Sequence, residues 1–482
     1  MRVLFVSPEA YPLIKTGGLA DVSGALPSAL SELGVDIRLL LPAYRSVFPA
    51  VDDLRVIAAL GNPFGTGEIQ ILEGHIPTYS HPVWLVDCSS LFDRGGDPYH
   101  DEYGNGWGDN GMRFAVFSWA AACLSVRGSP LSWVPDILHM NDWQSALAAA
   151  YLRSWGQPHA RTVTSIHNLA YQGNFPPDIL LSIGIPYDLY QPEGLEFYHH
   201  VSFMKAGIFY SDWLTTVSPT YAREIQTPQF GYGLEGLLAH RSPTLTGILN
   251  GADYTVWDPA SDPHIPHPYA APDFKPKALN KAVLQRELGL EEKPDAPLFV
   301  IISRLTHQKG IDLVLTTMPS LIAQGGQLAV LGTGDKDLEH AFRQVSDQNR
   351  KQLSVTIGYS EELAHRLQAG GDILLMPSRY EPCGLTQMYA FRYGTVPLVS
   401  RTGGLVDTVT DAGYDNLQHG MATGFLFDAA NAASLQWNIE RAVAHYHQPA
   451  QWAKIRQTGA AQDFSWRVSA QRYKNLYSAH AV

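Results

Sequence analysis

The sequence contains little cysteine and little basic charge. Its three cysteines, Cys88, Cys123 and Cys383, are widely spaced and form no CxxC pair, so neither a disulfide framework nor a structural zinc site is expected, and a reducing compartment is favoured. Lys and Arg number 34 against 46 Asp and Glu, a formal net charge of −12. This balance leaves no general positive field to hold a nucleic acid or an anionic membrane. An anionic ligand must therefore be bound by a few local cations.

Long apolar runs are also missing from the sequence. The N-terminal MRVLFVSPEAYP has four apolar residues before Ser7 and Pro8, too few for the core of a signal peptide, and no run of about 18 apolar residues follows. Hydrophobic residues make up 45% of the chain and charged residues 17%, which is typical of a well-packed globular enzyme. We therefore expect a soluble enzyme with no membrane partner.

The chain has the length and patterning of two domains. Its 482 residues exceed the roughly 250–300 at which one hydrophobic core stops growing. Short apolar runs alternate with amphipathic stretches from RVLFVS to WLTTVS, the alternation lapses in a Pro-, Asp- and His-rich stretch at 243–276, and it restarts from LFVIIS to VPLVS. Such runs are typical of strands buried on both faces of a parallel sheet. The pattern predicts two doubly wound α/β domains whose strand ends flank one crevice.

The alternation also places individual elements. In the first half, strands are expected over residues 2–7, 35–42, 83–88, 136–140, 162–168 and 213–218, with helices over 19–34, 112–124 and 145–155. In the second half, strands are expected over 298–303, 328–332, 353–358, 372–378 and 396–400, with helices from Gly310 and after Asp337.

A short string occurs once in each predicted domain. KTGGLAD at 15–21 is nearly repeated as RTGGLVD at 401–407, each after an expected strand and at the start of an expected helix. Glycine lets the backbone approach an anion, and a helix start offers unpaired N–H donors. The repeat predicts phosphate contacts at Gly17, Gly18, Gly403 and Gly404. The alternative is that these short strings only make turns.

Three cations follow the expected strands. Lys15 comes after the first strand, and Arg304 and Lys309 lie in SRLTHQKG directly after LFVII. A surface cation is usually only solvated. Their shared position in an acidic chain instead favours neutralisation of a diphosphate, including a departing one whose charge grows in the transition state.

Polar residues at other strand ends are candidates for sugar chemistry. Glu381, in RYEPCGLTQ after DILLMPS, is interpreted as a partner for sugar hydroxyls or a stabiliser of positive charge at an anomeric carbon, or else as a structural carboxylate. Cys383 is interpreted as a small residue that allows close backbone approach. His139, Asn141 and Asp142 follow one strand and His167 and Asn168 the next, where a hydrogen-bonded core histidine is the alternative.

The sequence does not have the spacing of a metal site. There is no HExxH, and the DxD-like string from Asp335 to Asp337 follows a Gly turn, where a helix N-cap explains it better. The irregular loop at 89–110 combines aromatics with Asp, Asn and Gly, the side chains of carbohydrate recognition, although a plain surface loop is the alternative. A reaction without metal or other cofactor is expected.

Nine strings in order resemble the bacterial glycogen synthase and plant starch synthase family of retaining, ADP-glucose-dependent glycosyltransferases. They are KTGGLADV, DRGGDPYHD, NDWQ, IHNLAYQG, SPTYAREI, ILNGAD, SRLTHQKG, IGYSEELAHR and PSRYEPCGLTQ, covering about residues 1–410. The resemblance implies a GT-B fold, two Rossmann-like domains facing a central cleft. It implies an acceptor domain at 1–245, a donor domain at 246–460, and a C-terminal helix at 461–482 that crosses back onto the first domain.

The resemblance also implies roles for individual residues. The catalytic set is Glu381, which would hold glucose hydroxyls, His167, which would contact the transferred glucose, Asp142, beside both sugars, and the cations Arg304 and Lys309. ADP would be bound by these two cations and by Lys15, Gly17, Gly18, Tyr359 (packed on adenine), Cys383, Gly384, Leu385, Thr386, Gly403 and Gly404. The α-glucan end would be bound by Asp21, Tyr99, Asn168 and Asn250.

The resemblance therefore predicts glucosyl transfer from ADP-glucose to the nonreducing 4-hydroxyl of an α-1,4-glucan, in the bacterial cytoplasm or, for a mature plant-type chain, the plastid stroma. One departure is visible, because many bacterial members have HDWH where this chain has NDWQ, with Asn141 and Gln144 in place of His. The sequence leaves open ADP-glucose against UDP-glucose and priming against elongation.

Three other functions are weighed against this prediction. A noncatalytic glycan-binding paralogue would not need the cations that suit a diphosphate. A nicotinamide-dependent dehydrogenase would need a GxGxxG with an acidic residue about 20 positions on, which is missing at the first strand. A glycoside hydrolase would use Asp142 and Glu381 as its carboxylate pair, but would not need phosphate-type turns.

Overall fold

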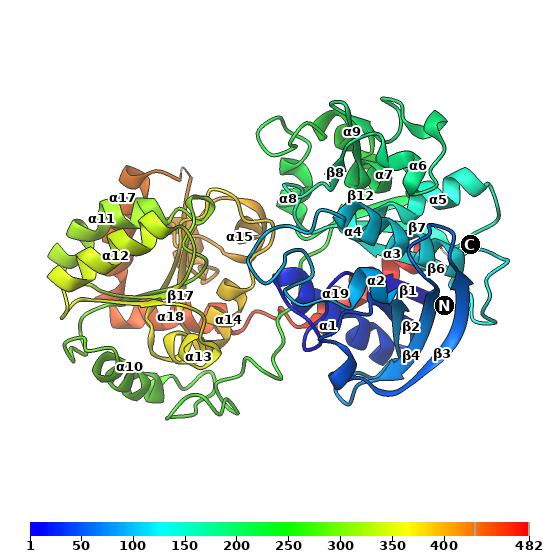
Figure 1. Ribbon diagram of the computed structural model, residues 1–482. Helices are drawn as coiled ribbons and strands as arrows, with labels where there is room; N and C mark the ends of the chain where they lie inside the picture. The colour runs from blue at the N-terminus through cyan, green and yellow to red at the C-terminus, as the bar shows by residue number, and fades with distance from the viewer. Residues whose placement is uncertain (429, 481–482) are drawn as a thin grey trace. The chain divides into compact units, whose positions relative to one another are not determined.

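The computed structural model describes residues 1–428 and 430–480, which form two compact units (Figure 1). The first unit contains Met1–Gly251 and the chain from Trp466 onward, and the second contains Ala252–Ser465. The sequence put the boundaries at residues 245 and 460, whereas the chain leaves the first unit at 251 and returns to it at 466. Residues 481–482 of the predicted C-terminal helix lie outside the described part. No helix in the described part is long and apolar enough to cross a membrane.

The first unit is built on a nine-stranded sheet in the order β12-β11-β7-β6-β1-β2-β5-β4-β3, parallel from β12 to β5. Strands β3 and β4 add an antiparallel edge that the sequence did not predict. Six of the ten residues of β3 are exposed, so this strand lacks the buried apolar run by which the other strands are recognised. The strands are β1 (Arg2–Val6), β2 (Asp36–Pro42), β3 (Asp52–Gly61), β4 (Ile69–His75), β5 (Val83–Asp87), β6 (Ile137–Asn141), β7 (Arg161–Ile166), β11 (Trp213–Thr216) and β12 (Leu245–Gly247).

Helices and a small sheet complete the first unit. The small antiparallel sheet has the order β8-β10-β9, from β8 (Asn174–Phe175), β9 (Glu196–Phe197) and β10 (His200–Ser202). The helix predicted over 145–155 is confirmed except at Leu147, where the chain divides into two short helices. The helices are α1 (Gly18–Glu32), α2 (Ser89–Phe92), α3 (Asn110–Leu124), α4 (Trp143–Ala146), α5 (Ala148–Trp155), α6 (Ile179–Ser182), α7 (Phe203–Tyr210), α8 (Pro219–Glu224), α9 (Glu235–His240) and α19 (Trp466–His480), with short 3-10 turns at Phe48–Ala50, Tyr187–Leu189 and Ser242–Thr244.

The C-terminal helix α19 is part of the core of the first unit. Its side chains Tyr473 and Tyr477 are buried there together with the strand residues. The Tyr477 hydroxyl is 2.6 Å from Nδ1 of the buried His139 on β6, and Nε2 of His139 is 2.6 Å from Ser165 Oγ on β7. The core-histidine alternative therefore holds for His139, which joins α19 to the sheet.

The second unit has a six-stranded parallel sheet in the order β15-β14-β13-β16-β17-β18. Helices cover both of its faces, as in the predicted doubly wound arrangement (Figure 1). Alternate residues of β13 face opposite sides. Phe299 and Ile301 lie in the core under α11 (Ile311–Ala323), α12 (Lys336–Gln348) and α17 (Ala432–Tyr446), and Leu298 and Val300 lie under α10 (Lys275–Glu287) and α13 (Glu361–Gly370). The strands are β13 (Leu298–Ile302), β14 (Gln327–Gly332), β15 (Leu353–Ile357), β16 (Ile373–Met376), β17 (Val396–Ser400) and β18 (Phe425–Phe427).

The helices of the second unit include several that were not predicted. They are α10 (Lys275–Glu287), α11 (Ile311–Ala323), α12 (Lys336–Gln348), α13 (Glu361–Gly370), α14 (Thr386–Tyr393), α15 (Gly403–Thr408), α16 (Tyr414–Gln418), α17 (Ala432–Tyr446) and α18 (Pro449–Ala460), with a 3-10 turn, η4, at His307–Lys309. Helix α12 begins at Lys336, slightly earlier than predicted. Asp335 occupies its N-cap position, although its side chain forms no capping hydrogen bond.

Both parallel sheets reverse their strand order at one point. In the first unit the reversal lies between β1 and β6, and in the second it lies between β13 and β16. Ligands of open α/β sheets bind at the carboxyl ends of the strands that flank such a point. The residues that follow Val6, Asn141, Ile302 and Met376 are therefore the first place to look for function.

Candidate active site

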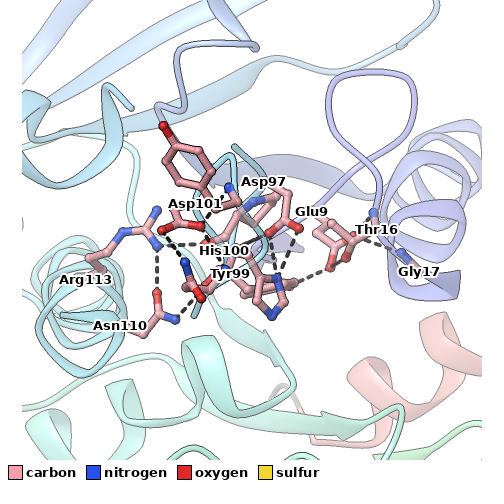
Figure 2. A network of polar contacts seen from close by, with 12 residues as sticks. Glu9, Thr16, Gly17, Asp97, Tyr99, His100, Asp101, Asn110 and Arg113 are labelled. Atoms are coloured by element: carbon pink, nitrogen blue, oxygen red, sulfur yellow. Dashed lines mark hydrogen bonds and ion pairs between the residues drawn. The ribbon is translucent and has the colours of Figure 1, made fainter. Parts of the chain in front are cut away.

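In the first unit, a buried carboxylate organises the end of β1. Glu9, which is 3% exposed, accepts hydrogen bonds from the Thr16 backbone N–H at 2.5 Å, the Thr16 hydroxyl at 2.6 Å and the Gly17 N–H at 3.2 Å. It also accepts one from the Tyr99 hydroxyl at 2.5 Å. Figure 2 shows Glu9 between the 15–18 turn on one side and the loop that carries Tyr99 on the other. Glu9 thus joins two segments that the sequence treated separately.

These contacts correct one prediction about the first TGGL string. Gly17 was expected to offer an unpaired N–H to a phosphate, but its N–H is donated to Glu9. Gly18 begins α1, where the first backbone N–H groups have no partner within the helix. Lys15 and Asp21, predicted for the donor and the acceptor respectively, form an ion pair at 2.8 Å on a partly exposed surface.

Asp142 and His167 meet at the ends of β6 and β7. Asp142 directly follows β6 in a strained left-handed conformation with φ 56°, and its Oδ1 accepts the His167 backbone N–H at 2.7 Å. Burial and, to a smaller extent, the charge of Glu9 raise the pKa of Asp142 to about 7, against the backbone donors of His167 and Asn168 that lower it. Burial lowers the pKa of His167 to about 3, so its imidazole is neutral at pH 7. The predicted catalytic pair is therefore in contact through the backbone.

The loop around Tyr99 is held by a hydrogen-bond network. Arg113, buried on α3, donates to the Pro98 carbonyl at 2.8 Å and to the Asn110 side chain at 2.7 Å, and Asn110 donates to the Tyr99 carbonyl at 3.0 Å (Figure 2). The Tyr99 hydroxyl also accepts a hydrogen bond from Gln144 at 3.1 Å. Burial and the neighbouring Glu9 carboxylate raise the pKa of Tyr99, so its hydroxyl stays protonated. The loop is thus tied to the strand ends of the sheet.

The two asparagines predicted to bind acceptor lie in different places. Asn168 follows His167, and its side chain accepts the Ala170 N–H at 3.1 Å. Asn250 follows the edge strand β12, away from the reversal point. Its buried amide oxygen has no hydrogen-bond partner in the described part of the chain, which is unusual for a buried acceptor.

In the second unit, Lys309 and Glu381 form a largely buried ion pair. Lys309 Nζ is 2.5 Å from Glu381 Oε2, and the Ser378 hydroxyl donates to the same oxygen at 3.0 Å. Lys309 follows β13 and Glu381 follows β16, the two strands at the reversal point. Gly310 makes this approach possible, because it has φ 66° and a Cβ there would lie 2.0 Å from the Pro377 carbonyl oxygen. The site residues predicted from separate motifs thus meet at one strand boundary.

The other predicted donor residues are more exposed. Arg304, also after β13, is exposed, and its guanidinium has no ion-pair partner among residues 1–428 and 430–480. Tyr359, 76% exposed, follows β15 and donates its hydroxyl hydrogen to Glu361. Both groups are accessible to a ligand from solution.

The second TGGL string packs against the Glu381 loop. Cβ atoms at Gly403 and Gly404 would lie 1.9 Å from the Glu381 carbonyl oxygen and 2.2 Å from that of Cys383. The Gly404 N–H is donated to the carbonyls of Glu381 and Pro382 at 3.2 and 3.1 Å, so this N–H is already paired within the chain, and the contact of Gly404 with ADP stays a prediction. The close approach at Cys383 agrees with its interpretation as a small residue at a crowded backbone.

Helix α14 begins beside this contact. Gly384 has a positive φ of 73°, Leu385 occupies the N-cap position, and Thr386 is the first residue of the helix. The Met388 N–H donates to the Leu385 carbonyl at 2.9 Å, whereas the N–H groups of Thr386 and Gln387 have no partner within the helix. In the described part of the chain, no group of three or more His, Cys, Asp or Glu residues has the arrangement of a metal site.

Comparisons with known proteins decide the family. The starch synthase catalytic domain family matches residues 2–240, and the group 1 glycosyl transferases match residues 286–458. The glycogen synthase of Paramagnetospirillum magneticum is 55% identical over 99% of this chain and 97% of its own, and that of Rhodospirillum rubrum is 48% identical over 99% and 98%. The chain belongs to the glycogen and starch synthase family.

Solved structures agree with this family assignment. The catalytic domain of starch synthase IV from Arabidopsis thaliana, solved bound to ADP and acarbose, is 32% identical with a TM-score of 0.87, covering 100% of this chain and 99% of that one. Sucrose-phosphate synthase from Thermosynechococcus elongatus, 16% identical with a TM-score of 0.62 over 99% and 98%, shares the fold. The predicted GT-B fold is confirmed, and this member of the synthase family is a glucosyltransferase.

Sequence reasoning missed two residues of this family member's site. Glu9 was passed over, although a carboxylate three residues after a buried strand end was a usable signal. Ser378, in DILLMPS, gave no signal, because a serine after a strand is common in turns. Asn141, named among the polar residues after its strand, and Gln144, noted only as a departure, make specific hydrogen bonds to His167 and Tyr99 respectively.

Proposed function

We propose that the chain transfers glucose from ADP-glucose to the nonreducing 4-hydroxyl of an α-1,4-glucan, with retention of configuration. The observation that carries the donor half is the pair of cations after β13, with Lys309 fixed by Glu381 at 2.5 Å and Arg304 exposed. Two cations at one strand end suit a diphosphate. The Arabidopsis starch synthase IV structure holds ADP and acarbose, and ADP is what ADP-glucose leaves after transfer.

The second unit supplies the donor chemistry in this proposal. Lys309 and Arg304 stabilise the diphosphate as its negative charge grows during departure. Glu381 uses Oε2 to hold Lys309, while Oε1 has no hydrogen bond within the described part of the chain and accepts from glucose hydroxyls. The first turn of α14, including Thr386, donates to phosphate and sugar, and Tyr359 packs on adenine.

The first unit supplies the acceptor chemistry in this proposal. His167 contacts the transferred glucose, Asp142 lies beside both sugars, and Tyr99, Asp21, Asn168 and Asn250 bind the glucan end. In the bond-changing step, the anomeric C1 loses its bond to the phosphate oxygen and gains one to the acceptor O4 on the same face. The acceptor proton passes to the leaving phosphate, so no protein nucleophile is needed and positioning supplies most of the rate.

We propose that no metal or other cofactor takes part, because Lys309 and Arg304 provide the positive charge that a metal supplies in many phosphoryl-leaving reactions. We also propose the bacterial cytoplasm as the location, since the curated relatives described above are bacterial.

The test is nucleotide release from ADP-glucose and, in parallel, UDP-glucose, each with and without glycogen and with chelator present. Glycogen-dependent release of ADP that survives chelation and is lost in Glu381→Ala supports the proposal. Glu440→Ala, at an exposed glutamate on α17, is the matched control. Release without glycogen indicates donor hydrolysis, and no release from either sugar indicates a noncatalytic paralogue. Proton NMR of the product then checks that the new linkage has the α configuration.

A further inference from the structure

Asn141, the last residue of β6, is held in one orientation by the neighbouring strand. Its side chain is buried, and its Nδ2 donates to the carbonyl oxygen of Val6, at the end of β1, at 3.0 Å. A carbonyl oxygen can only accept a hydrogen bond, so the amide must present its NH₂ group to Val6. The amide oxygen, Oδ1, therefore faces the other way.

The amide oxygen of Asn141 in turn fixes the proton on His167. Nε2 of His167 lies 2.9 Å from Asn141 Oδ1, and an amide oxygen has no hydrogen to donate. Nε2 must therefore carry the proton of that hydrogen bond. Because burial lowers the pKa of His167 to about 3, the ring is neutral at pH 7 and has only this one N–H.

The remaining ring nitrogen, Nδ1, is then an acceptor. Within residues 1–428 and 430–480 it forms no hydrogen bond. The backbone N–H of His167 is held at 2.7 Å by Asp142, the residue next to Asn141. Two consecutive residues thus fix both the main chain and the ring of His167.

We propose that Asn141 is a positioning residue that holds His167 as the Nε2–H tautomer, so that Nδ1 accepts a hydrogen bond from a sugar hydroxyl. The sugar is the one assigned to His167 in the proposed function, on which this part rests. A histidine at position 141, as the resemblance describes for many bacterial members, can offer either a donor or an acceptor nitrogen and would not impose one tautomer in this way.

The direct test is the tautomer itself. Long-range proton–nitrogen NMR of the full chain with labelled histidine distinguishes protonated from unprotonated ring nitrogens, and a His167→Gln variant assigns the signal. In the unmodified chain we expect Nε2 protonated and Nδ1 unprotonated from pH 6 to 8. A protonated Nδ1 in that range overturns the proposal. The ring signals of His139, whose two nitrogens both face hydroxyl groups, serve as an internal reference in the same spectra.

Asn141→Asp provides a second test with nearly the same shape. A carboxylate beside Nε2 favours the doubly protonated imidazolium, in which Nδ1 can no longer accept. The titratable groups around His167 are Asp142, His139 and, beyond Asp142, Glu9. Because these are common to both proteins, we compare the variant with the unmodified chain at each pH. Relative kcat/KM should fall about 10- to 100-fold at pH 6, as when a partner orienting a functional histidine is lost, and recover toward pH 9.

A matched control and the possible outcomes complete this test. Asn62→Asp adds the same charge at an exposed turn where the side chain accepts the Gly67 N–H at 3.1 Å, and its profile should follow the unmodified chain. Parallel pH profiles for Asn141→Asp and the unmodified chain overturn the proposal. If glucosyl transfer is absent while the NMR shows the expected tautomer, the proposed function fails and the role of Asn141 toward His167 stands.

Discussion

The two units share a plan but differ in the charge at their strand ends. Each has a sheet whose parallel strands reverse order next to the unit's first strand, and each places several of its predicted site residues there. At the end of β1 and β6 the cluster contains the carboxyl groups of Glu9 and Asp142 with a neutral His167. At the end of β13 and β16 it contains Arg304 and Lys309 with Glu381. Topology therefore sets where a site forms, and the loops set its chemistry.

The repeated TGGL string makes the same point at closer range. In the first unit the donors of Thr16 and Gly17 go to a side-chain carboxylate, and the helix begins at the second glycine, Gly18. In the second unit the helix begins at the first glycine, Gly403, and the Gly404 N–H goes to backbone carbonyls. Equal strings thus gave different turns, with φ −153° at Gly17 and 45° at Gly403, and different hydrogen-bond partners, because the partners come from other parts of the chain.

The largest expected effect tests the cationic side of this comparison. Lys309→Ala should lower kcat about 10²- to 10³-fold, because the charge on the leaving diphosphate loses a fixed donor. Steady-state kinetics with ADP-glucose and glycogen measure it. Lys293→Ala is the control, since its pair with Glu291 at 2.8 Å is exposed, and it should leave kcat unchanged. A loss below threefold in Lys309→Ala would show that the charge difference between the units is not used in this way.

A second prediction tests the carboxylate side. Asp142 has an ordinary pKa of 3.8 that burial raises to about 7, so the native state binds more protons than the unfolded state between these values. The contribution of Asp142 to the free energy of unfolding must then fall as pH rises from about 4 to about 7. Asp142→Asn removes this dependence and should gain on the order of 2–4 kcal/mol relative to the unmodified chain between pH 4 and pH 8. Unfolding at several pH values, with Asp295→Asn as an exposed control, checks it. An equal difference at both ends of the range contradicts it.

A third prediction concerns a buried histidine of the second unit, whose protonation changes the stability of that unit. His365 is buried, with Nδ1 2.8 Å from Asp262 and its ring stacked on Trp257. Although burial opposes the charge, Asp262 and Glu361 raise the pKa of His365 to about 9, and Tyr393 and His264 are the other titratable neighbours. Protonated His365 therefore stabilises the folded state fully below about pH 6.5, and this stabilisation is lost as pH rises through about 9.

His365→Asn should remove on the order of 2–3 kcal/mol from the second unit at pH 6, and the deficit should shrink toward pH 10. Denaturant unfolding followed by hydrogen exchange of α13 peptides measures it, with His447→Asn as the exposed control. A deficit that stays constant with pH would mean that His365 acts by packing alone.

The sequence located the parts of both units that depend on local pattern. Buried strands such as β1, β6 and β13 were visible because their residues are apolar on both faces. The edge strands β3 and β4 were missed because they are identified as strands by their pairing with each other and not by their composition. Likewise Glu9, 90 residues from Tyr99, has no local signal for that contact. The pairing of Lys309 with Glu381 follows only once the strand order is known.

The smallest expected effect concerns α19, the C-terminal helix that belongs to the first unit. Tyr477→Phe keeps the ring but removes the hydroxyl 2.6 Å from His139 Nδ1, leaving a buried polar atom without its partner. Such a loss costs about 1–2 kcal/mol. Amide hydrogen exchange should therefore speed up in α19 while peptides of the second unit stay unchanged, and Tyr414→Phe, at an exposed tyrosine, should change neither. Equal acceleration in both units would show that α19 stabilises the whole chain rather than the sheet of β1 and β6.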